Sequence, residues 1–252
     1  MSSNRDAFAW AIASNRSRIK HVSGTQYVVH LDDIEPTRDG GIEIRVTFDS
    51  RNGCDRLTQR VLRLGTGSSH ERRTGSDQEV LYVASGRGSL ALDGAAHELQ
   101  ADTGVYIAPG TQYVIRADDE LTIVSVVAPN LGAASAGTSV VRFAEQEELD
   151  ASPERSFRYL TDEGDLTQFI GIVQPSKAPF HSHPYDELGF IVEGQGVAHV
   201  GGAEIPLRAG SCFHLAPGEV HCIENSGTGP MRILGVFNPS DSPASRTYPD
   251  NN

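Results

Sequence analysis

Two stretches of this sequence repeat one another without a gap, and this internal repeat limits the possible folds more than any other feature. EVLYVASGRGSLALDGA begins at Glu79 and ELGFIVEGQGVAHVGGA begins at Glu187, so the offset is 108 residues (187 − 79). The offset is unchanged farther along, where YIAPGTQYVI is matched by HLAPGEVHCI. An ungapped series of this length indicates a duplicated domain. The identical pairs are Glu79/Glu187, Gly86/Gly194, Gly88/Gly196, Gly94/Gly202, Pro109/Pro217 and Gly110/Gly218.

Each copy has the pattern of short strands joined by tight turns. A short apolar strand is followed by a Gly-x-Gly turn, a second strand and a glycine-containing hairpin turn. This spacing is typical of an antiparallel sandwich or barrel and not of a βαβ architecture. The GRG and GQG triplets at residues 86–88 and 194–196 join two strands with no helix behind them, so we interpret them as hairpin turns and not phosphate loops.

The repeat and the composition of the segments between its copies divide the chain. We expect only a few short helices, at residues 5–19 and around residues 143–149. The segment between the copies is small and polar, and the end of the chain is polar and proline-rich, so neither is expected to have regular structure of its own. The expected parts are an N-terminal domain at 1–129, a linker at 130–139, a C-terminal domain at 140–240 and a polar tail at 241–252.

Charge and cysteine usage exclude some partners. The formal net charge of −12 gives no electrostatic support for binding nucleic acid or an anionic membrane. No apolar run has the length of a signal peptide or of a membrane span. Cys54, Cys212 and Cys222 are an odd number without paired spacing, as in a protein whose thiols stay reduced. We therefore expect a cytoplasmic protein.

The sequence HSHPYDE at residues 181–187 has the spacing of a metal site. His181 and His183 alternate along an extended strand, so both side chains can point to the same face, and Glu187 follows at an even spacing. His221 follows the turn at Pro217, which places it on a different strand. Three imidazoles and one carboxylate suit zinc, iron, manganese, nickel or copper, and leave coordination positions open. An isolated His-x-His is usually not a site, so the prediction depends on the whole set.

The runs HSHPYDELGFIVEG and AGSCFHLAPGEVHCIEN resemble the two sequence motifs of the cupin superfamily. This resemblance implies a bicupin, an all-β chain of two tandem jelly-roll barrels, and it also implies a homodimer. The second motif has one more residue between Gly210 and Pro217 than its commonest form. The alternative is a cupin that keeps these residues to bind a sugar or an anion. The matched residues are His181, His183, Glu187 and Gly194 in the first motif, and Gly210, Pro217, Gly218, His221 and Asn225 in the second.

The N-terminal copy keeps one of the four expected ligands. Glu79 stands at the position of Glu187, and His70 lies three residues away from the required position. We therefore expect one metal ion per chain, in the C-terminal domain, and a role for the first barrel in packing, dimerisation or one wall of the site. The other three positions hold Arg73 for His181, Gly75 for His183 and Tyr113 for His221.

Three further residues are candidates for catalysis, and each also has a structural interpretation. Tyr185 lies between the ligands and offers a hydroxyl group. His214 either faces the cavity as a proton shuttle or lies on the other face of the sheet in a hydrogen bond. Gln168 alternates with Ile170 and Ile172, so it either projects over the ion or belongs to an ordinary half-buried strand.

The fold does not by itself decide the function, because cupins host many unrelated activities. The favoured hypothesis is a metal-dependent oxidoreductase, a non-haem metal dioxygenase that uses iron or manganese on a small polar metabolite. The first alternative is a non-redox metalloenzyme, an isomerase, lyase, decarboxylase or aminohydrolase, that acts on a small organic acid. The second is a cupin that binds a small molecule without turnover. In each case we expect an organic acid or another metal-chelating metabolite as partner.

Overall fold

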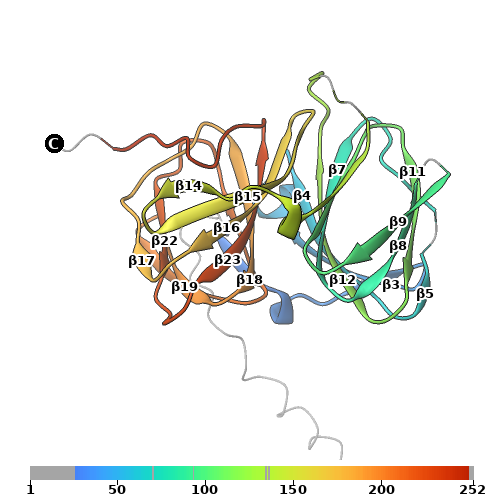
Figure 1. Cartoon of the computed structure of the whole chain (residues 1–252). Helices are drawn as coiled ribbons and strands as arrows, with labels where there is room; N and C mark the ends of the chain where they lie inside the picture. Colours follow the sequence, from blue (N-terminus) through green and yellow to red (C-terminus); the bar gives the residue numbers. More distant parts are fainter. Residues whose placement is uncertain (1–25, 70, 93, 134, 136, 250–252) are drawn as a thin grey trace, which may run out of the picture.

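The computed structural model describes residues 26–69, 71–92, 94–133, 135 and 137–249. Figure 1 shows two β-barrels side by side, coloured green and orange-red. The described residues are almost entirely β-structure, with 3-10 helices at Leu31–Asp33, Ser50–Asn52 and Phe143–Glu145. The helix expected at 143–149 is thus one short turn followed by a strand, and the helix expected at 5–19 lies outside the described residues. None of the helices in the described part of the chain is long and apolar enough to cross a membrane.

The first barrel consists of two antiparallel sheets. The larger has the order β13-β10-β7-β12-β4-β3-β2, and the smaller has the order β5-β11-β8-β9 with β6 also paired to β11. In the larger sheet the strands are β2 (Thr37–Asp39), β3 (Ile42–Phe48), β4 (Thr58–Leu64), β7 (Gln78–Ser85), β10 (Thr103–Ile107), β12 (Leu121–Ala128) and β13 (Ser139–Arg142). In the smaller they are β5 (Gly67–Ser68), β6 (Arg72–Arg73), β8 (Arg87–Leu92), β9 (Ala95–Gln100) and β11 (Gln112–Ala117).

The second barrel repeats this architecture. Its larger sheet has the order β1-β21-β18-β23-β16-β15-β14, and its smaller sheet has the order β17-β22-β19-β20. The larger sheet contains β1 (Val28–His30), β14 (Leu149–Ser152), β15 (Arg155–Glu163), β16 (Leu166–Val173), β18 (Asp186–Glu193), β21 (Ser211–Leu215) and β23 (Met231–Asn238). The smaller sheet contains β17 (Ser176–Lys177), β19 (Gln195–Val200), β20 (Ala203–Arg208) and β22 (His221–Asn225).

The internal repeat of the sequence is also a repeat of the structure. Strands β7, β8, β9 and β10 correspond to β18, β19, β20 and β21, each with both ends displaced by 108 residues. The first glycine of each Gly-x-Gly turn has a positive φ, 89° at Gly86 and 91° at Gly194, which favours glycine. At the second, Gly88 or Gly196, an added Cβ would lie 2.1 Å from a backbone oxygen of the neighbouring strand. A positive φ thus favours the first glycine, and close packing requires the second. The matching strands confirm the duplicated all-β fold.

The two barrels exchange edge strands. Strand β1 pairs with β21 of the second barrel, with Val28 opposite Phe213, and β13 pairs with β10 of the first barrel, with Arg142 opposite Thr103. The expected division therefore does not describe the pairing at either end: Val28–His30 belongs to the second barrel, and Ser139–Arg142 to the first. A short edge strand can pair with any open edge within reach, and sequence alone does not identify that edge.

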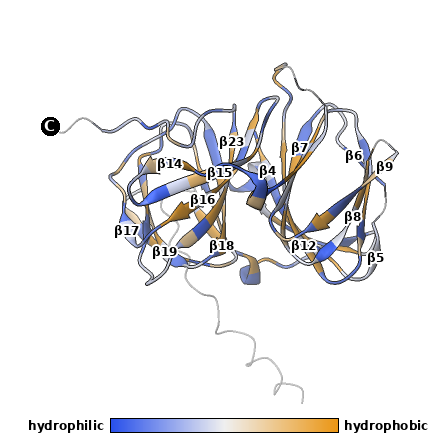
Figure 2. Cartoon of the chain, in the orientation of Figure 1, coloured by the Kyte–Doolittle hydropathy of each residue, from blue (hydrophilic) through white to orange (hydrophobic). Residues whose placement is uncertain are grey.

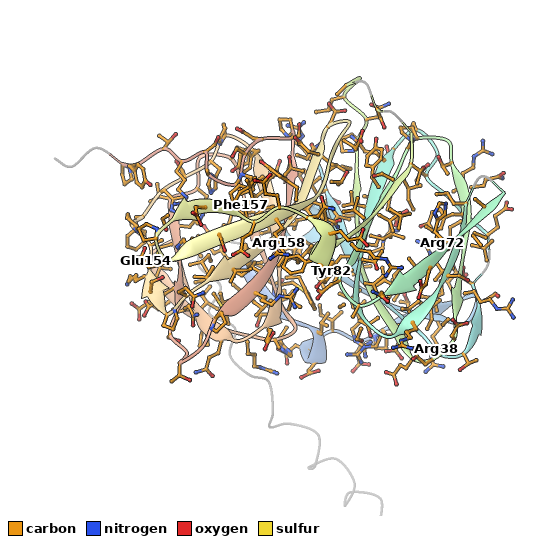
Figure 3. All side chains as sticks on the ribbon, viewed as in Figure 1. Arg38, Arg72, Tyr82, Glu154, Phe157 and Arg158 are labelled. Atoms are coloured by element: carbon orange, nitrogen blue, oxygen red, sulfur yellow. The ribbon has the colours of Figure 1, made fainter. Side chains whose placement is uncertain are left out.

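Apolar side chains fill each barrel and the layer between the barrels. One buried cluster joins residues of both barrels, among them Tyr82 and Val126 of the first and Leu188 and Val236 of the second. Two other clusters fill the interior of the first and of the second barrel. Figure 2 shows that the hydrophobic residues follow the strands, and Figure 3 shows the side chains that fill the space where Tyr82 lies. This shared layer joins the two barrels.

Candidate metal centre

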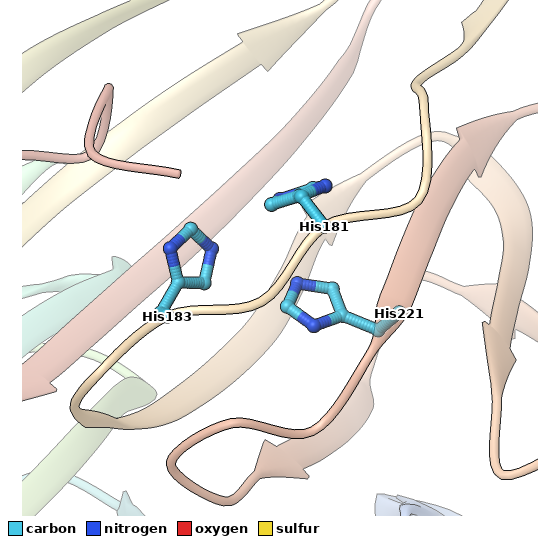
Figure 4. A group of neighbouring side chains, drawn as sticks. All are labelled: His181, His183 and His221. Atoms are coloured by element: carbon cyan, nitrogen blue, oxygen red, sulfur yellow. The ribbon is translucent and has the colours of Figure 1, made fainter. Parts of the chain in front are cut away.

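Three buried histidines meet in the second barrel, as Figure 4 shows. His181 and His183 lie on the segment that leads into β18, and His221 begins β22. The backbones of His181 and His221 form an antiparallel bridge, with hydrogen bonds of 3.0 and 2.9 Å. This bridge brings their ring centroids to 4.5 Å. The ligand nitrogens of the three residues all lie within 4.8 Å of one another.

Backbone carbonyl groups fix the orientation and the tautomer of all three rings. Each Nδ1 lies at hydrogen-bond distance from a carbonyl oxygen, which only accepts, so each Nδ1 carries the proton and donates it. The lone pair of each Nε2 is then free for a metal ion. The carbonyl groups belong to Pro179 for His181 at 2.9 Å, Ser245 for His183 at 2.7 Å and Glu219 for His221 at 2.9 Å.

Burial keeps these imidazoles neutral. It lowers the pKa of His181 to about 3 and that of His183 to about 4, and it also lowers the pKa of His221. The neutral imidazole is the form that binds a metal ion. The three rings are therefore ready to act as ligands at neutral pH without losing a proton.

Glu187 is the fourth expected ligand, and its carboxylate has an unsatisfied oxygen. The Oε2 atom is buried without a hydrogen-bond partner and lies 3.6 Å from Nε2 of His183. The carboxylate is close to His183 but lies more than 4.8 Å from at least one of the other two histidine ligand atoms. Burial raises the pKa of Glu187 to about 7. Because a buried carboxylate without a partner is costly, and because three imidazoles and a carboxylate suit a divalent transition metal, the residues fit such an ion.

The four residues open into a cavity of about 90 Å³ with mainly apolar walls. Two positively charged residues, Arg155 and Arg246, also line it. Neither arginine was predicted from the sequence, because β15 and the tail lie outside the two motifs and no local pattern marks either residue. The apolar walls comprise Phe157, Phe169, Gly171, Val173, Phe213, Ile223, Ile233, Phe237 and Pro243.

The polar tail is part of the site, contrary to the expectation for residues 241–252. Ser182 and Thr247 form an antiparallel backbone bridge in which each N–H donates to the other carbonyl oxygen at 2.9 Å. The Ser245 carbonyl oxygen accepts the hydrogen bond from Nδ1 of His183, and Pro243 and Arg246 line the cavity. Residues 241–249 are therefore ordered by backbone hydrogen bonds to the metal-binding segment, which no composition rule reveals.

The sequence suggested Tyr185 as a catalytic hydroxyl group, but its side chain does not line the cavity. Its ring is 1% exposed and stacks on His183 at an interplanar angle of 11°, with Phe237 packed on it at 4.2 Å. Its hydroxyl lies 3.0 Å from Nδ1 of His183 and donates to the Ser242 carbonyl oxygen at 3.4 Å. The Tyr185 side chain therefore helps to hold the ring of His183 in its orientation.

His214 and Gln168, the other two catalytic candidates from the sequence, also do not line the cavity. His214 follows Phe213, and Gln168 precedes Phe169; both phenylalanines line the cavity. Adjacent residues on a strand point to opposite faces, so His214 and Gln168 point away from it. Nε2 of His214 lies 3.0 Å from an oxygen of Asp186, in the layer between the barrels. Gln168 is fully buried in the same layer, and a Cβ added to Gly104 of the first barrel would lie 3.0 Å from its Oε1.

The first barrel has a hydrogen-bond network where the second has its ligands. Glu79, which corresponds to Glu187, accepts hydrogen bonds from Tyr113 at 2.7 Å and from Ser125 at 2.5 Å. Nε of Arg72 donates to the Tyr113 hydroxyl at 3.0 Å. Both carboxylate oxygens of Glu79 are thus satisfied by side chains. Among the residues that the structure describes, which leave out His70, the three histidines are the one group with metal-ligand spacing.

A comparison with protein families points to the same part of the chain. Residues 169–237 match the family model of the cupin domain. This range contains all four expected ligands, whereas Arg155 and the tail lie outside it. An oxalate-binding protein of Thermotoga maritima is 36% identical over 63 residues, which are 25% of this chain and 52% of that protein. The chain thus spans about half the length of the curated relative that it matches.

Two solved structures share the fold over both barrels. Protein Ylba of E. coli has a TM-score of 0.74 at 16% identity, and the match covers 91% of this chain and 96% of that one. Oxalate decarboxylase from Bacillus subtilis, in its structure at pH 4.6, has a TM-score of 0.69 at 14% identity, with 86% and 77% covered. The segment that matches the cupin-domain model is therefore part of a two-barrel fold that known proteins also have.

Proposed function

We propose that this chain is a metal-dependent enzyme that acts on a small organic acid in its second barrel. The proposal depends on the buried Oε2 of Glu187, which has no hydrogen-bond partner and lies 3.6 Å from Nε2 of His183, one of three imidazoles whose Nε2 atoms are free. His181, His183, His221 and Glu187 would hold one divalent ion, with iron or manganese as the first candidates and nickel, zinc or copper as others. When bound, the ion would supply Lewis-acid polarisation of a coordinated oxygen.

The surrounding residues of the chain prepare the cavity for an acid. Phe157, Phe213 and Ile233 give apolar walls that exclude water and strengthen electrostatic interactions inside. Arg155 and Arg246 contribute positive charge that attracts an anion. The comparisons support the same substrate class, because the curated relative is named for oxalate binding and one structural neighbour is an oxalate decarboxylase.

For the reaction type we propose dioxygenase chemistry first and a non-redox reaction such as decarboxylation second. Three histidines and one glutamate around an apolar cavity support the first, since a water-poor site suits a metal that reacts with oxygen. The likeness to oxalate decarboxylase supports the second. We also propose a homodimer formed through an open sheet edge such as β14, which light scattering after gel filtration would test.

Metal analysis and anaerobic turnover test these proposals. Purified protein is expected to contain about one divalent ion per chain, because the described residues offer one ligand group. Turnover of keto-acids, diketones and dicarboxylates would then be compared with and without oxygen. Turnover that stops without oxygen identifies an oxygenase, and unchanged turnover identifies the non-redox reaction. A protein that takes up no metal after reconstitution would contradict both, and a ligand that protects against unfolding but stays unaltered would indicate binding alone.

A further inference from the structure

Two arginines in the cavity have no acidic partner. Elsewhere in the chain, Arg142, Arg158 and Arg232 are paired with carboxylates at 2.9, 2.9 and 2.7 Å. Among the described residues, no carboxylate oxygen lies within 4.0 Å of Arg155 or Arg246, the two arginines that line the cavity. A guanidinium group that is half-buried without a counter-charge is costly, so this pair of arginines is suited to an anionic ligand.

The hydrogen bonds of these arginines leave most of their donors free. One terminal nitrogen of Arg155 donates to the Ile223 carbonyl oxygen at 2.8 Å, which fixes the side chain on the cavity wall. The Nε of Arg246 is buried and has no hydrogen-bond partner. A guanidinium group has five N–H donors in a planar fork, and that fork matches a carboxylate in a bidentate arrangement.

The charges in the cavity act on one another. The positive charge of Arg246 lowers the pKa of Arg155, after the larger effect of burial. The same charge is among the causes that lower the pKa of His181, His183 and His221, and it opposes the raised pKa of Glu187. Arg246 therefore lies within electrostatic reach of Arg155 and of all four expected ligands. Negative charge also acts on the site, from Asp241 on His183 and from Glu154 on Arg155, but neither carboxylate is paired with Arg155 or Arg246.

We propose that Arg155 and Arg246 form an anion subsite beside the metal ligands, and that the substrate is a small dianion such as a dicarboxylate. One acid group would bind at the ion, and the second would bind between the two guanidinium groups. The cavity of about 90 Å³ has room for a few non-hydrogen atoms between the two acid groups. This inference rests on the proposed function for the first acid group, whereas the arginine subsite exists without the ion.

The C-terminal tail carries one half of this subsite. Arg246 lies between Ser245, whose carbonyl binds His183, and Thr247, whose backbone pairs with Ser182. The position of Arg246 is therefore fixed on both sides by contacts with the metal-binding segment. The subsite is complete only when residues 241–249 are docked, so substrate binding and docking of the tail are expected to favour one another.

Calorimetric titration with malonate and acetate tests the proposal, on manganese-loaded and on metal-free protein. We expect the loaded protein to bind malonate more tightly than acetate, because acetate has one acid group. Arg155→Gln and Arg246→Gln should each weaken malonate binding about 10- to 100-fold, the loss of a charged hydrogen bond, with a smaller effect on acetate. Arg208→Gln is the matched control, because this arginine is in the same barrel with a side chain that is 61% exposed.

The outcomes separate this inference from the proposed function. Equal affinity for malonate and acetate, or malonate affinity that Arg246→Gln leaves unchanged, would overturn the subsite even if the metal binds as proposed. Binding of malonate to a protein that takes up no metal, lost in Arg246→Gln, would support the subsite and contradict the metal proposal. Metal content and thermal unfolding of each variant, compared with the wild type, exclude misfolding as the cause.

Discussion

His183 and Ser245 are 62 residues apart in the sequence, and Nδ1 of His183 donates a 2.7 Å hydrogen bond to the carbonyl oxygen of Ser245. The tail of the chain thus orients an expected metal ligand and sets its tautomer. The acceptor is a backbone carbonyl group. The presence of this hydrogen bond therefore depends on the path of the tail and not on the serine side chain. A site that looks local in the sequence, HSHPYDE, is completed by a segment far outside it.

Removal of residues 241–252 should weaken metal binding while the barrels stay folded. The truncated chain loses the Ser245 carbonyl and the Thr247 bridge, but keeps β23, which is central in its sheet. Loss of such an outer contact typically lowers metal affinity about 10- to 100-fold. Competition with a chelator measures the affinity, and circular dichroism measures folding. Full-length Arg246→Gln is the control that removes the charge and keeps the docked tail; an unchanged affinity of the truncated chain would contradict the prediction.

His183→Ala should abolish stoichiometric metal binding, and Tyr113→Phe should not change it. The first substitution removes one imidazole from the group of three, and the second removes a hydroxyl from the network of the first barrel. Elemental analysis after reconstitution gives the metal content per chain. If Tyr113→Phe halves the metal content, the first barrel also binds an ion. If His183→Ala keeps a full equivalent, the assignment of the ligands is wrong.

Metal binding near pH 6 should release about one proton per chain, and that proton should come from Glu187. Its raised pKa of about 7 means that the metal-free carboxyl group is protonated at pH 6, whereas the ligand form is ionised. His181 and His183, with pKa values of about 3 and 4, are already neutral and release none. The release should therefore fade as the pH rises through 7 to 8.

Calorimetry in buffers of different ionisation enthalpy counts these protons. Glu187→Gln removes the titrating group, so this variant should bind metal more weakly and release close to no protons at pH 6. Release of two or more protons by the wild type at pH 6 would show that the histidines are protonated in the free protein, contrary to the effect of burial.

Gly189→Ala should destabilise the second barrel by about 1–3 kcal/mol, the usual cost of overpacking a core. An added Cβ at Gly189 would lie 2.0 Å from the ring of Phe213, which must move towards the cavity. Gly65→Ala is the matched control, because its Cβ meets no atom within 4 Å and no positive φ is required there. Urea denaturation gives both free energies of unfolding. Equal stability of the two variants would show that Phe213 can shift without cost.

Two features were predictable because they depend on residues close together in the sequence. The 108-residue repeat predicted two barrels, since Gly-x-Gly turns and alternating strands are local patterns with a defined geometry. The spacing of His181 and His183 predicted neighbouring side chains on one face, since alternation along a strand guarantees it. His221 was also predicted, because it follows the turn at Pro217 that leads into the next strand.

The remaining features depended on which parts of the chain pack together in three dimensions. Alternation shows that His214 and Phe213 point to opposite faces, but only the packed barrel decides that Phe213 faces the cavity and His214 the other barrel. The exchanged strands β1 and β13, and the bridge between Thr247 of the tail and Ser182, are long-range contacts. The sequence by itself determined the barrels and the histidines of the site. Tertiary structure alone decided the charge, walls and closure of the cavity, because these come from segments that meet only when both barrels are folded.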